Sequence, residues 1–311
     1  MIQIFSGNYV GNGVIDTLIA VGADLTAQNS FVIVKRSNAA TIGALRWTGM
    51  QANGSFSFGS GGYDFNGIRN FAGTGFNVGN GINVNGPGDA YEWVAIIGTA
   101  GEIDTGTYTG NGADNRTIAL SLGGGTPAWV IVKKEGTPPA QQRMGSNVGD
   151  QSGQMNGVAF TADRIQAFGV DSFEIGSNTE VNGNLDVFVF IAFKSIVGTF
   201  EAGSYVGDGL DNRDIVAGFL PEFVLLLGTN AMPARFRTSN MVGDTGSLGV
   251  SGTNSGFAAN RIQALQATGF QIGTDADVNV LASTYFFVAA MDSAAPPAGI
   301  AGSRMLMGVG N

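Results

Sequence analysis

The feature that most constrains this chain is an internal repeat with a period close to 97 residues. A Gly-x-Tyr-x-Gly-Asn/Asp-Gly segment begins at Gly7 and returns at Gly106 and Gly203. Further markers return in the same order at steps of 97 residues: Phe76, Phe173 and Phe270, then Asn85, Asn182 and Asn279. Because so many markers recur in one order, the sequence predicts three copies of a single structural unit.

The length of the repeat indicates what kind of unit it is. A period of 97 residues is too long for a solenoid, whose repeats have about 20 to 45 residues, and it suits a small β-sandwich. We therefore expect three sandwich domains over residues 1–100, 101–197 and 198–293. A C-terminal tail over residues 294–311 falls outside the repeat.

Short apolar runs within each copy predict β-strands. They are rich in β-branched and aromatic residues and are bounded by polar or turn residues, which is typical of core strands buried on both faces. The runs lie at residues 31–34, 129–132, 188–193, 223–227 and 285–290. Asn-Gly pairs suit type I′ turns and predict two-residue hairpins. The pairs begin at Asn12, Asn53, Asn66, Asn80, Asn111, Asn156 and Asn182.

The predicted fold class is therefore all-β, with three tandem sandwich-like (jelly-roll-type) units. Residues 258–267 come nearest to a helical pattern, and no other segment approaches one. The units could be strung out as beads, or they could close around a pseudo-threefold axis and imitate a trimer within one chain. The junctions between the copies are short, which favours close packing.

Composition excludes several kinds of chemistry. The 311 residues include no His and no Cys, so a Ser-His-Asp triad, a His-ligated metal, a thiol nucleophile and a disulfide are impossible. The net charge of −9 argues against nucleic acid or an anionic membrane as a partner, because both are bound through clustered Lys and Arg. The longest apolar run has seven residues, so no membrane insertion is expected. We also expect no cofactor and no enzymatic activity.

A few side chains still call for a choice between a functional and a structural role. Asp208, Asp211 and Asp214 could ligate calcium, but the other copies lack most of these acids, so a solvated turn is the preferred interpretation. Paired carboxylates could cleave a glycan without His, but the acids are scattered along the sequence.

Three aromatic residues are peculiar to the first copy. Trp47, Tyr63 and Phe65 could form a platform on which a glycan stacks, or they could fill a core or an interface, which we favour. In the tail, Met305, Leu306 and Met307 form an apolar group among glycines. Because a free apolar tail invites aggregation, we expect this group to dock on another subunit or another unit.

The motifs of the second copy resemble those of a known kind of domain. Gly106 opens a Gly-x-Tyr-x-Gly-Asn-Gly-x-Asp-Asn-Arg segment, which is followed by the runs at residues 127–134, 173–177 and 188–193. Together they resemble β-sandwich domains of a poorly characterised family found in tail-fibre-like and other virion proteins of tailed phages. The resemblance is strongest over residues 106–194, weaker over 203–292 and weakest over 7–98.

The resemblance implies a setting rather than an activity, because its motifs are turns and core strands. It implies a non-enzymatic structural protein of the virion, tail- or fibre-associated, in contact with the host surface and made in the bacterial cytoplasm. Other virion proteins are the expected partners, and a host-surface glycan is a further candidate. A capsid decoration (cement) protein and a glycan-binding or glycan-cleaving adhesin remain as alternatives.

Overall fold

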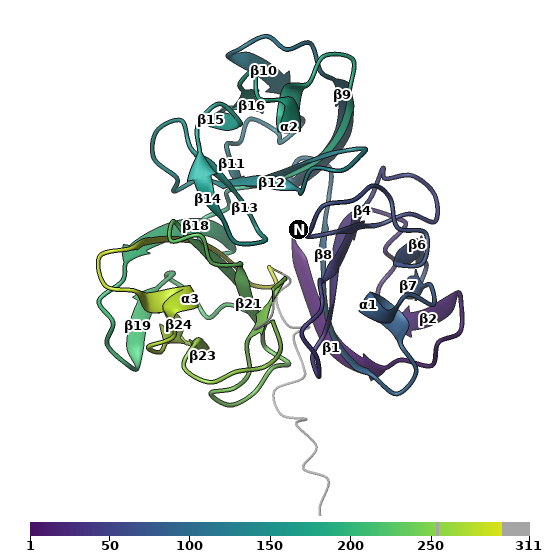
Figure 1. The fold of residues 1–311 in the computed structure, drawn as a ribbon, viewed down its shortest axis with the longest axis vertical. Helices are drawn as coiled ribbons and strands as arrows, with labels where there is room; N and C mark the ends of the chain where they lie inside the picture. The colour runs from purple at the N-terminus through teal and green to yellow at the C-terminus, as the bar shows by residue number, and fades with distance from the viewer. Residues whose placement is uncertain (253–254, 294–311) are drawn as a thin grey trace, which may run out of the picture.

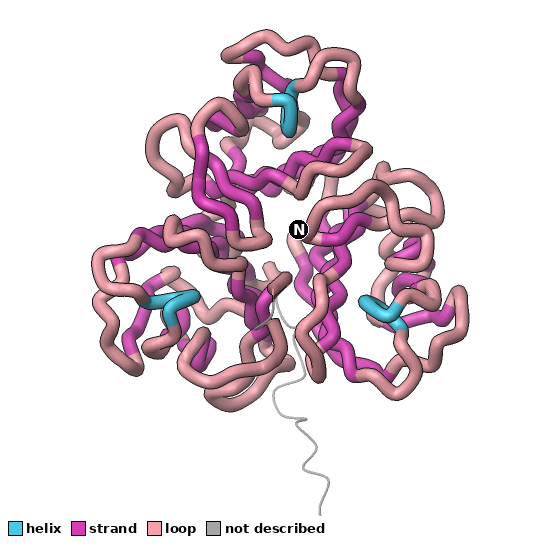
Figure 2. The backbone as a smooth tube through the Cα atoms, in the orientation of Figure 1, coloured by secondary structure: helices cyan, strands magenta, loops and turns pink. Residues whose placement is uncertain are grey.

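The all-β prediction is confirmed. The computed structural model describes residues 1–252 and 255–293, whose regular elements are antiparallel β-strands and three helices of four residues each. The strands form three lobes arranged around a common centre, with the N-terminus near that centre (Figure 1). Each lobe holds one of the short helices (Figure 2). Of the helices in the described residues, none is long and apolar enough to cross a membrane.

Lobe 1 consists of two antiparallel sheets. The larger has the strand order β1-β8-β3-β4-β5 and the smaller has the order β2-β7-β6. The bounds are β1 (Gln3–Val10), β2 (Thr17–Ala20), β3 (Asn29–Arg36), β4 (Ala44–Trp47), β5 (Phe56–Ser57), β6 (Ile68–Ala72), β7 (Gly75–Val78), α1 (Ile82–Asn85) and β8 (Ala90–Gly98).

Lobe 2 has the same order with one strand added at the edge of its larger sheet. That sheet runs β9-β17-β11-β12-β13-β14, and the smaller one runs β10-β16-β15. The bounds are β9 (Ile103–Thr109), β10 (Arg116–Ala119), β11 (Pro127–Lys134), β12 (Gln141–Met144), β13 (Ser152–Gln154), β14 (Val158–Thr161), β15 (Ile165–Gly169), β16 (Ser172–Ile175), α2 (Thr179–Asn182) and β17 (Val187–Lys194).

Lobe 3 also follows the order of lobe 1. Its sheets run β18-β25-β20-β21-β22 and β19-β24-β23. The bounds are β18 (Phe200–Val206), β19 (Arg213–Val216), β20 (Phe223–Gly228), β21 (Arg235–Thr238), β22 (Leu248–Gly249), β23 (Ile262–Gln266), β24 (Gly269–Ile272), α3 (Ala276–Asn279) and β25 (Thr284–Ala290). Residues 258–267, whose sequence pattern comes nearest to that of a helix, thus contain the strand β23 and no helix.

The strand order accounts for the jelly-roll-like character of each lobe. The first strand pairs with the last, as in β1 with β8, and the second pairs with the one before it, as in β2 with β7. These two pairs lie in different sheets and so wrap the chain around the core of the lobe. The middle strands β3, β4 and β5 form a simple meander.

The central strand of each larger sheet is buried on both faces. In β3, Val32 and Val34 belong to the core between the two sheets of lobe 1, whereas Phe31 and Ile33 belong to a core at the centre of the molecule. Successive strand residues point to opposite faces, so both cores take alternate residues of one run. This double burial explains why the strand sequences are continuously apolar instead of alternating with polar residues.

The central core draws side chains from all three lobes. Phe31 of lobe 1 meets Trp129 and Phe193 of lobe 2 at centroid distances of 5.6 and 5.5 Å. Phe193 in turn stacks on Phe200 of lobe 3 at 5.0 Å. Aromatic pairs at these distances and angles attract each other beyond their buried area, by about 0.5 to 1.5 kcal/mol.

Hydrogen bonds between lobes close the arrangement into a ring. In each lobe, the loop that follows the central strand of the larger sheet reaches the segment beyond the fifth strand of a neighbour. The backbone bonds are Gly43 N to Val250 O at 2.8 Å, Gly61 N to Thr137 O at 2.9 Å and Ala234 N to Met155 O at 2.9 Å. The loop of lobe 1 thus contacts lobe 3, the loop of lobe 3 contacts lobe 2, and the loop of lobe 2 contacts lobe 1. The contacts run head to tail, and the three lobes form a closed ring.

The repeated Gly-x-Tyr-x-Gly-Asn/Asp-Gly segment has a structural role. In lobe 2, Tyr108 Oη donates to Val181 O at 2.6 Å, and Asn182 Oδ1 accepts the Asn111 N–H at 3.0 Å. A Cβ at Gly110 would lie 2.0 Å from a backbone oxygen just after α2, so only glycine permits this approach. The motif therefore fastens the start of each lobe to its short helix.

The predicted Asn-Gly hairpins are wrong. A type I′ turn needs positive φ at both residues, and no pair has this. Of the seven asparagines, Asn53 has a positive φ, but the glycine after it does not. Gly13, Gly112 and Gly157 have a positive φ, but the asparagines before them do not. The true two-residue hairpin loops are 73–74, 170–171 and 267–268. The sequence also missed the helices, since one turn is too short to show a period.

Loss of a buried asparagine should test the role of the motif. Asn182 is fully buried, and its side chain bonds Asn111 N, Ala113 O and Gly176 O. Asn182→Ala leaves these backbone groups without partners, so we expect a loss of about 2 to 4 kcal/mol in the free energy of unfolding. Chemical denaturation measures it, with the exposed Asn184→Ala as control. Equal stability of the two variants would contradict the assignment.

Candidate functional site

The structure places Trp47 where it cannot bind a glycan. Its side chain is 1% exposed and lies in the central core, beside Phe31 at 6.4 Å and Phe56 at 6.3 Å between ring centroids. The glycan-platform hypothesis is therefore wrong for this residue. The indole fills a core, as the alternative interpretation predicted. Trp47 is an interior residue because β4 belongs to the sheet that faces the centre.

Tyr63 and Phe65 differ from each other in exposure. Tyr63 is half-buried, stacks on Phe56 at 4.2 Å and donates through its hydroxyl to Glu135 Oε1 of lobe 2 at 3.2 Å. Phe65 is 46% exposed, with its ring 6.3 Å from that of Tyr63. The tyrosine thus helps to seal the junction of lobes 1 and 2. Of the three aromatic residues, Phe65 alone presents a largely free ring.

The remaining candidates from the sequence do not form a site. Asp208 pairs with Arg213 at 3.3 Å and accepts a hydrogen bond from Asn279, so it supports the local turn. Within residues 1–252 and 255–293, no group of three or more carboxylates is placed to hold a metal ion. Met305, Leu306 and Met307 lie outside the described residues.

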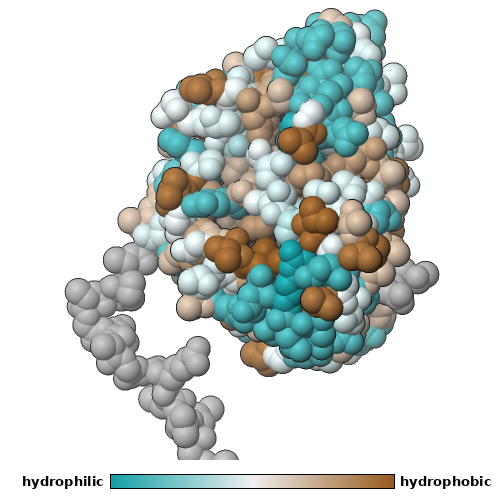
Figure 3. Space-filling view, turned by 90° about the vertical axis from the view of Figure 1, so that its left-hand side faces the viewer, coloured by the Kyte–Doolittle hydropathy of each residue, from teal (hydrophilic) through white to brown (hydrophobic). Residues whose placement is uncertain are grey.

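Many exposed apolar side chains of the described residues are scattered over the surface. Exposed ones such as Val148, Val197 and Val242 belong to different loops. On the face shown in Figure 3 the hydrophobic residues form small separate groups among polar ones. Scattered apolar residues of this kind are ordinary on a soluble surface and identify no site by themselves.

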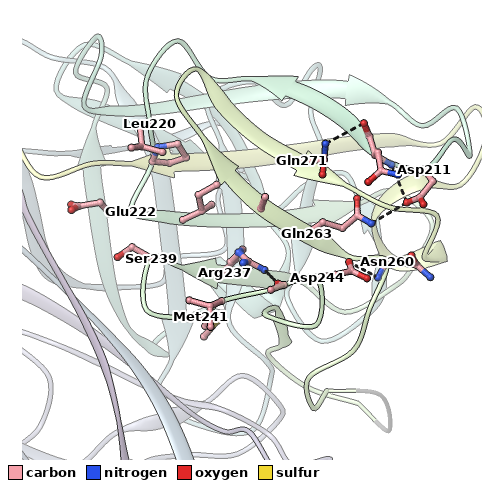
Figure 4. Close-up of a pocket in the computed structure, with 16 residues that line it drawn as sticks. Asp211, Leu220, Glu222, Arg237, Ser239, Met241, Asp244, Asn260, Gln263 and Gln271 are labelled. Atoms are coloured by element: carbon pink, nitrogen blue, oxygen red, sulfur yellow. Dashed lines mark hydrogen bonds between the residues drawn. The ribbon is translucent and has the colours of Figure 1, made fainter. Parts of the chain in front are cut away.

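Lobe 3 contains an open groove (Figure 4). It has a volume of about 800 Å³ and lies between the two sheets of the lobe, where β21 approaches β23. We call it the lobe 3 groove. Its lining residues are Asp211, Asn212, Leu220, Pro221, Glu222, Arg237, Ser239, Met241, Val242, Gly243, Asp244, Asn260, Gln263, Ala264, Leu265 and Gln271.

Arg237 is the positively charged residue of the groove. Its Nη1 donates to Gly243 O and Ile262 O, both at 2.9 Å, and the side chain is 4% exposed. Burial lowers the pKa of the guanidinium, and the Asp244 carboxylate opposes that shift. Its Nε has no hydrogen-bond partner among the described residues.

The same arginine occurs in the other lobes, but there an aromatic ring covers it. The guanidinium of Arg46 lies 5.5 Å from the Phe71 ring, and that of Arg143 lies 5.8 Å from the Phe168 ring. Leu265 occupies the equivalent position in β23 of lobe 3, as the register of the hairpin shows. A smaller cavity of about 440 Å³ at the corresponding place in lobe 2 is lined by Arg143 and Phe168. We attribute the larger groove of lobe 3 to the missing ring.

Three carboxylates give the groove its acidic character. Asp211 Oδ1 accepts from Gln263 Nε2 at 3.0 Å, and Asp244 Oδ1 accepts from the Asn260 N–H at 3.2 Å. Burial raises the pKa of Glu222, although the Asp292 N–H donates to its Oε2 at 2.8 Å. The groove offers hydrogen-bond acceptors, amide groups and apolar side chains, which suits binding of a small polar ligand.

A smaller cavity of about 230 Å³ adjoins the groove at the junction of lobes 1 and 3. It shares Met241 and Val242 with the groove and contains Glu92, whose Oε2 accepts from Asn240 Nδ2 at 3.1 Å. Burial raises the pKa of Glu92 to about 7. The carboxyl group therefore changes its charge near neutral pH, at the junction of two lobes that are not consecutive in the chain.

Sequence reasoning missed the lobe 3 groove. Its signal was an exception within the repeat: Leu265 where the other copies have Phe71 and Phe168. No protein-family model and no curated protein matches the chain. A function can therefore be inferred only from the geometry of this chain and from the resemblance of its motifs to virion β-sandwich domains.

The raised pKa of Glu92 predicts that stability falls as the pH rises. The folded state holds the proton more tightly than the unfolded chain, so its contribution is complete below pH 4.5 and is lost as the pH passes about 7. Glu92→Gln cannot ionise. We expect it to become more stable than the wild type by about 1 to 3 kcal/mol between pH 5 and pH 8.

Thermal unfolding across this pH range makes the measurement. Glu174→Gln, which removes a carboxylate from β16 of lobe 2, is the control for the loss of one acid. If the difference between wild type and Glu92→Gln does not change with pH, Glu92 does not titrate in this range.

Proposed function

We propose that this chain is a non-enzymatic structural protein of a tailed-phage virion, associated with the tail and in contact with the host surface. The observation that carries the proposal is the combination of a closed three-lobed body with the lobe 3 groove. A closed body that presents a groove suits attachment. The resemblance of the repeat motifs to virion sandwich domains supports the setting.

The use of polar side chains within the fold supports a structural role. The polar residues of the repeated motif bond to the backbone of their own lobe, as Asn182 and Tyr108 do. The buried arginines Arg46, Arg143 and Arg237 likewise donate to backbone carbonyls. Weak binding by a single groove becomes effective when a particle carries several copies.

The ring closure favours a second candidate, a decoration protein of the phage head. Three similar lobes around one centre present a nearly threefold surface within a single chain. Such a body could occupy a threefold or quasi-threefold position of a shell as a monomer, where a homotrimer would otherwise be needed. This candidate gives the groove no role.

Copy number in purified particles distinguishes these candidates. A tail component should be present in a few to a few dozen copies, and a head decoration protein in hundreds. Quantitative mass spectrometry gives the number, and antibody labelling in electron micrographs gives the position. We expect the lower number and a label at the tail. Hundreds of copies over the head would replace the tail proposal by the decoration protein, and absence from particles would refute both.

A further inference from the structure

The charges of the lobe 3 groove select against acidic ligands. Asp211, Glu222 and Asp244 line the groove together with one guanidinium, that of Arg237, which already donates to two backbone carbonyls. The whole chain carries a net charge of −9, so the long-range field has the same sign as the groove. A sialylated, uronic or phosphorylated ligand would meet repulsion both on approach and in contact.

The hydrogen-bonding groups of the groove suit hydroxyl groups. Gln263, Gln271 and Asn260 are amides, each with both donors and an acceptor, and the carboxylates add acceptors. Gln263 is 8% exposed, and its Oε1 has no hydrogen-bond partner among the described residues, although its Nε2 bonds Asp211. A hydroxyl both donates and accepts, so it can bond to an amide and a carboxylate side by side.

Apolar side chains line one part of the groove, together with Glu222 and Ser239. Leu220 and Val242 are 51% and 79% exposed, and Pro221 and Met241 lie beside them in the lining. In Figure 4, Leu220 and Met241 lie on the side opposite Gln271 and Asn260. A pyranose ring has hydroxyl groups at its edge and C–H groups on its faces, so it suits a groove that offers both hydrogen-bonding groups and apolar side chains. A volume of about 800 Å³ falls within the range of sites that enclose most of a ligand of several hundred daltons.

We propose that the lobe 3 groove binds a neutral, hydroxyl-rich oligosaccharide. The inference deepens the proposed function and rests on it for its biological meaning, since the oligosaccharide would belong to the host surface. The chemistry of recognition depends only on the groove. Lobes 1 and 2 do not take this ligand, because Phe71 and Phe168 cover their arginines.

The decisive variant introduces into lobe 3 the phenylalanine that lobes 1 and 2 have at the equivalent position. Leu265→Phe places a ring where Phe71 and Phe168 lie, and it should cover Arg237 and fill the groove. Leu281→Phe makes the same exchange at a 72%-exposed position of lobe 3 outside the groove lining, and it is the matched control. Both proteins are first compared with the wild type by thermal unfolding.

Binding is measured by calorimetry with the full chain. The probes are neutral tri- and tetrasaccharides of glucose, galactose and N-acetylglucosamine, together with sialylated and uronate-containing counterparts of the same length. We expect at least one neutral probe to bind at least tenfold more tightly than its acidic counterpart. Leu265→Phe should weaken this binding at least tenfold, and Leu281→Phe should change it less than twofold.

A charge variant keeps the proposal testable if Leu265→Phe does not fold. Asp244→Asn keeps an oxygen that can accept the Asn260 N–H and removes one negative charge from the groove. We expect the preference for neutral over acidic probes to fall at least fivefold. An unchanged preference would show that the groove does not make the selection.

Other outcomes would overturn the inference. These are equal or tighter binding of the acidic probes, unchanged binding in Leu265→Phe, and binding of a basic oligopeptide without any saccharide. Cleavage of a bound probe, abolished in Glu222→Gln, would refute the non-enzymatic role. Absence of the chain from particles would refute the virion proposal while leaving saccharide binding intact, so the two failures are distinguishable.

Discussion

Burial of the larger sheets on both faces is the constraint on which the rest of the structure depends. The strand β3 gives alternate side chains to the core of its own lobe and to the central core, and β11 and β20 do the same. A lobe on its own would expose rings such as Phe31 and Trp129 to water, which costs roughly 1.5 to 3 kcal/mol for each large apolar side chain. The lobes are therefore not independent beads, and ring closure is a condition of their stability.

Fusion of the three lobes in one chain permits differences that a homotrimer could not have. At the last central-core position of the central strand, lobes 1 and 2 have the buried Lys35 and Lys133, whereas lobe 3 has Leu227. Burial lowers the pKa of these lysines to about 7 and about 8, and Lys133 Nζ donates to Gly61 O across the lobe junction at 2.8 Å. Each junction can thus be tuned separately, and the replacement of a phenylalanine by Leu265 is a further difference of this kind.

The sequence was informative where one physical effect dominated. Continuous apolar runs identified the central strands, because burial on both faces leaves no position for a polar residue. The Asn-Gly pairs misled because Asn182 forms long-range bonds to the start of its lobe, a role that local turn statistics do not contain. Trp47 could be assigned to a core or a surface only once the packing of β4 against the centre was known. The groove escaped prediction because its signal is a single replacement within the repeat, Leu265 for a phenylalanine. One replacement does not form a motif.

The saccharide binding that we propose would need neither His nor Cys, because its selectivity would come from the distribution of polar groups. Arg46, Arg143 and Arg237 are buried and donate to carbonyls, so few cations remain to attract anions at the surface. The lining of the lobe 3 groove contains amides and carboxylates whose bonds to their neighbours hold them in place, as Gln263 is held by Asp211. Groups that are held in place lose little freedom on binding, so the proposed selectivity would follow from the position and sign of charge and would need no reactive side chain.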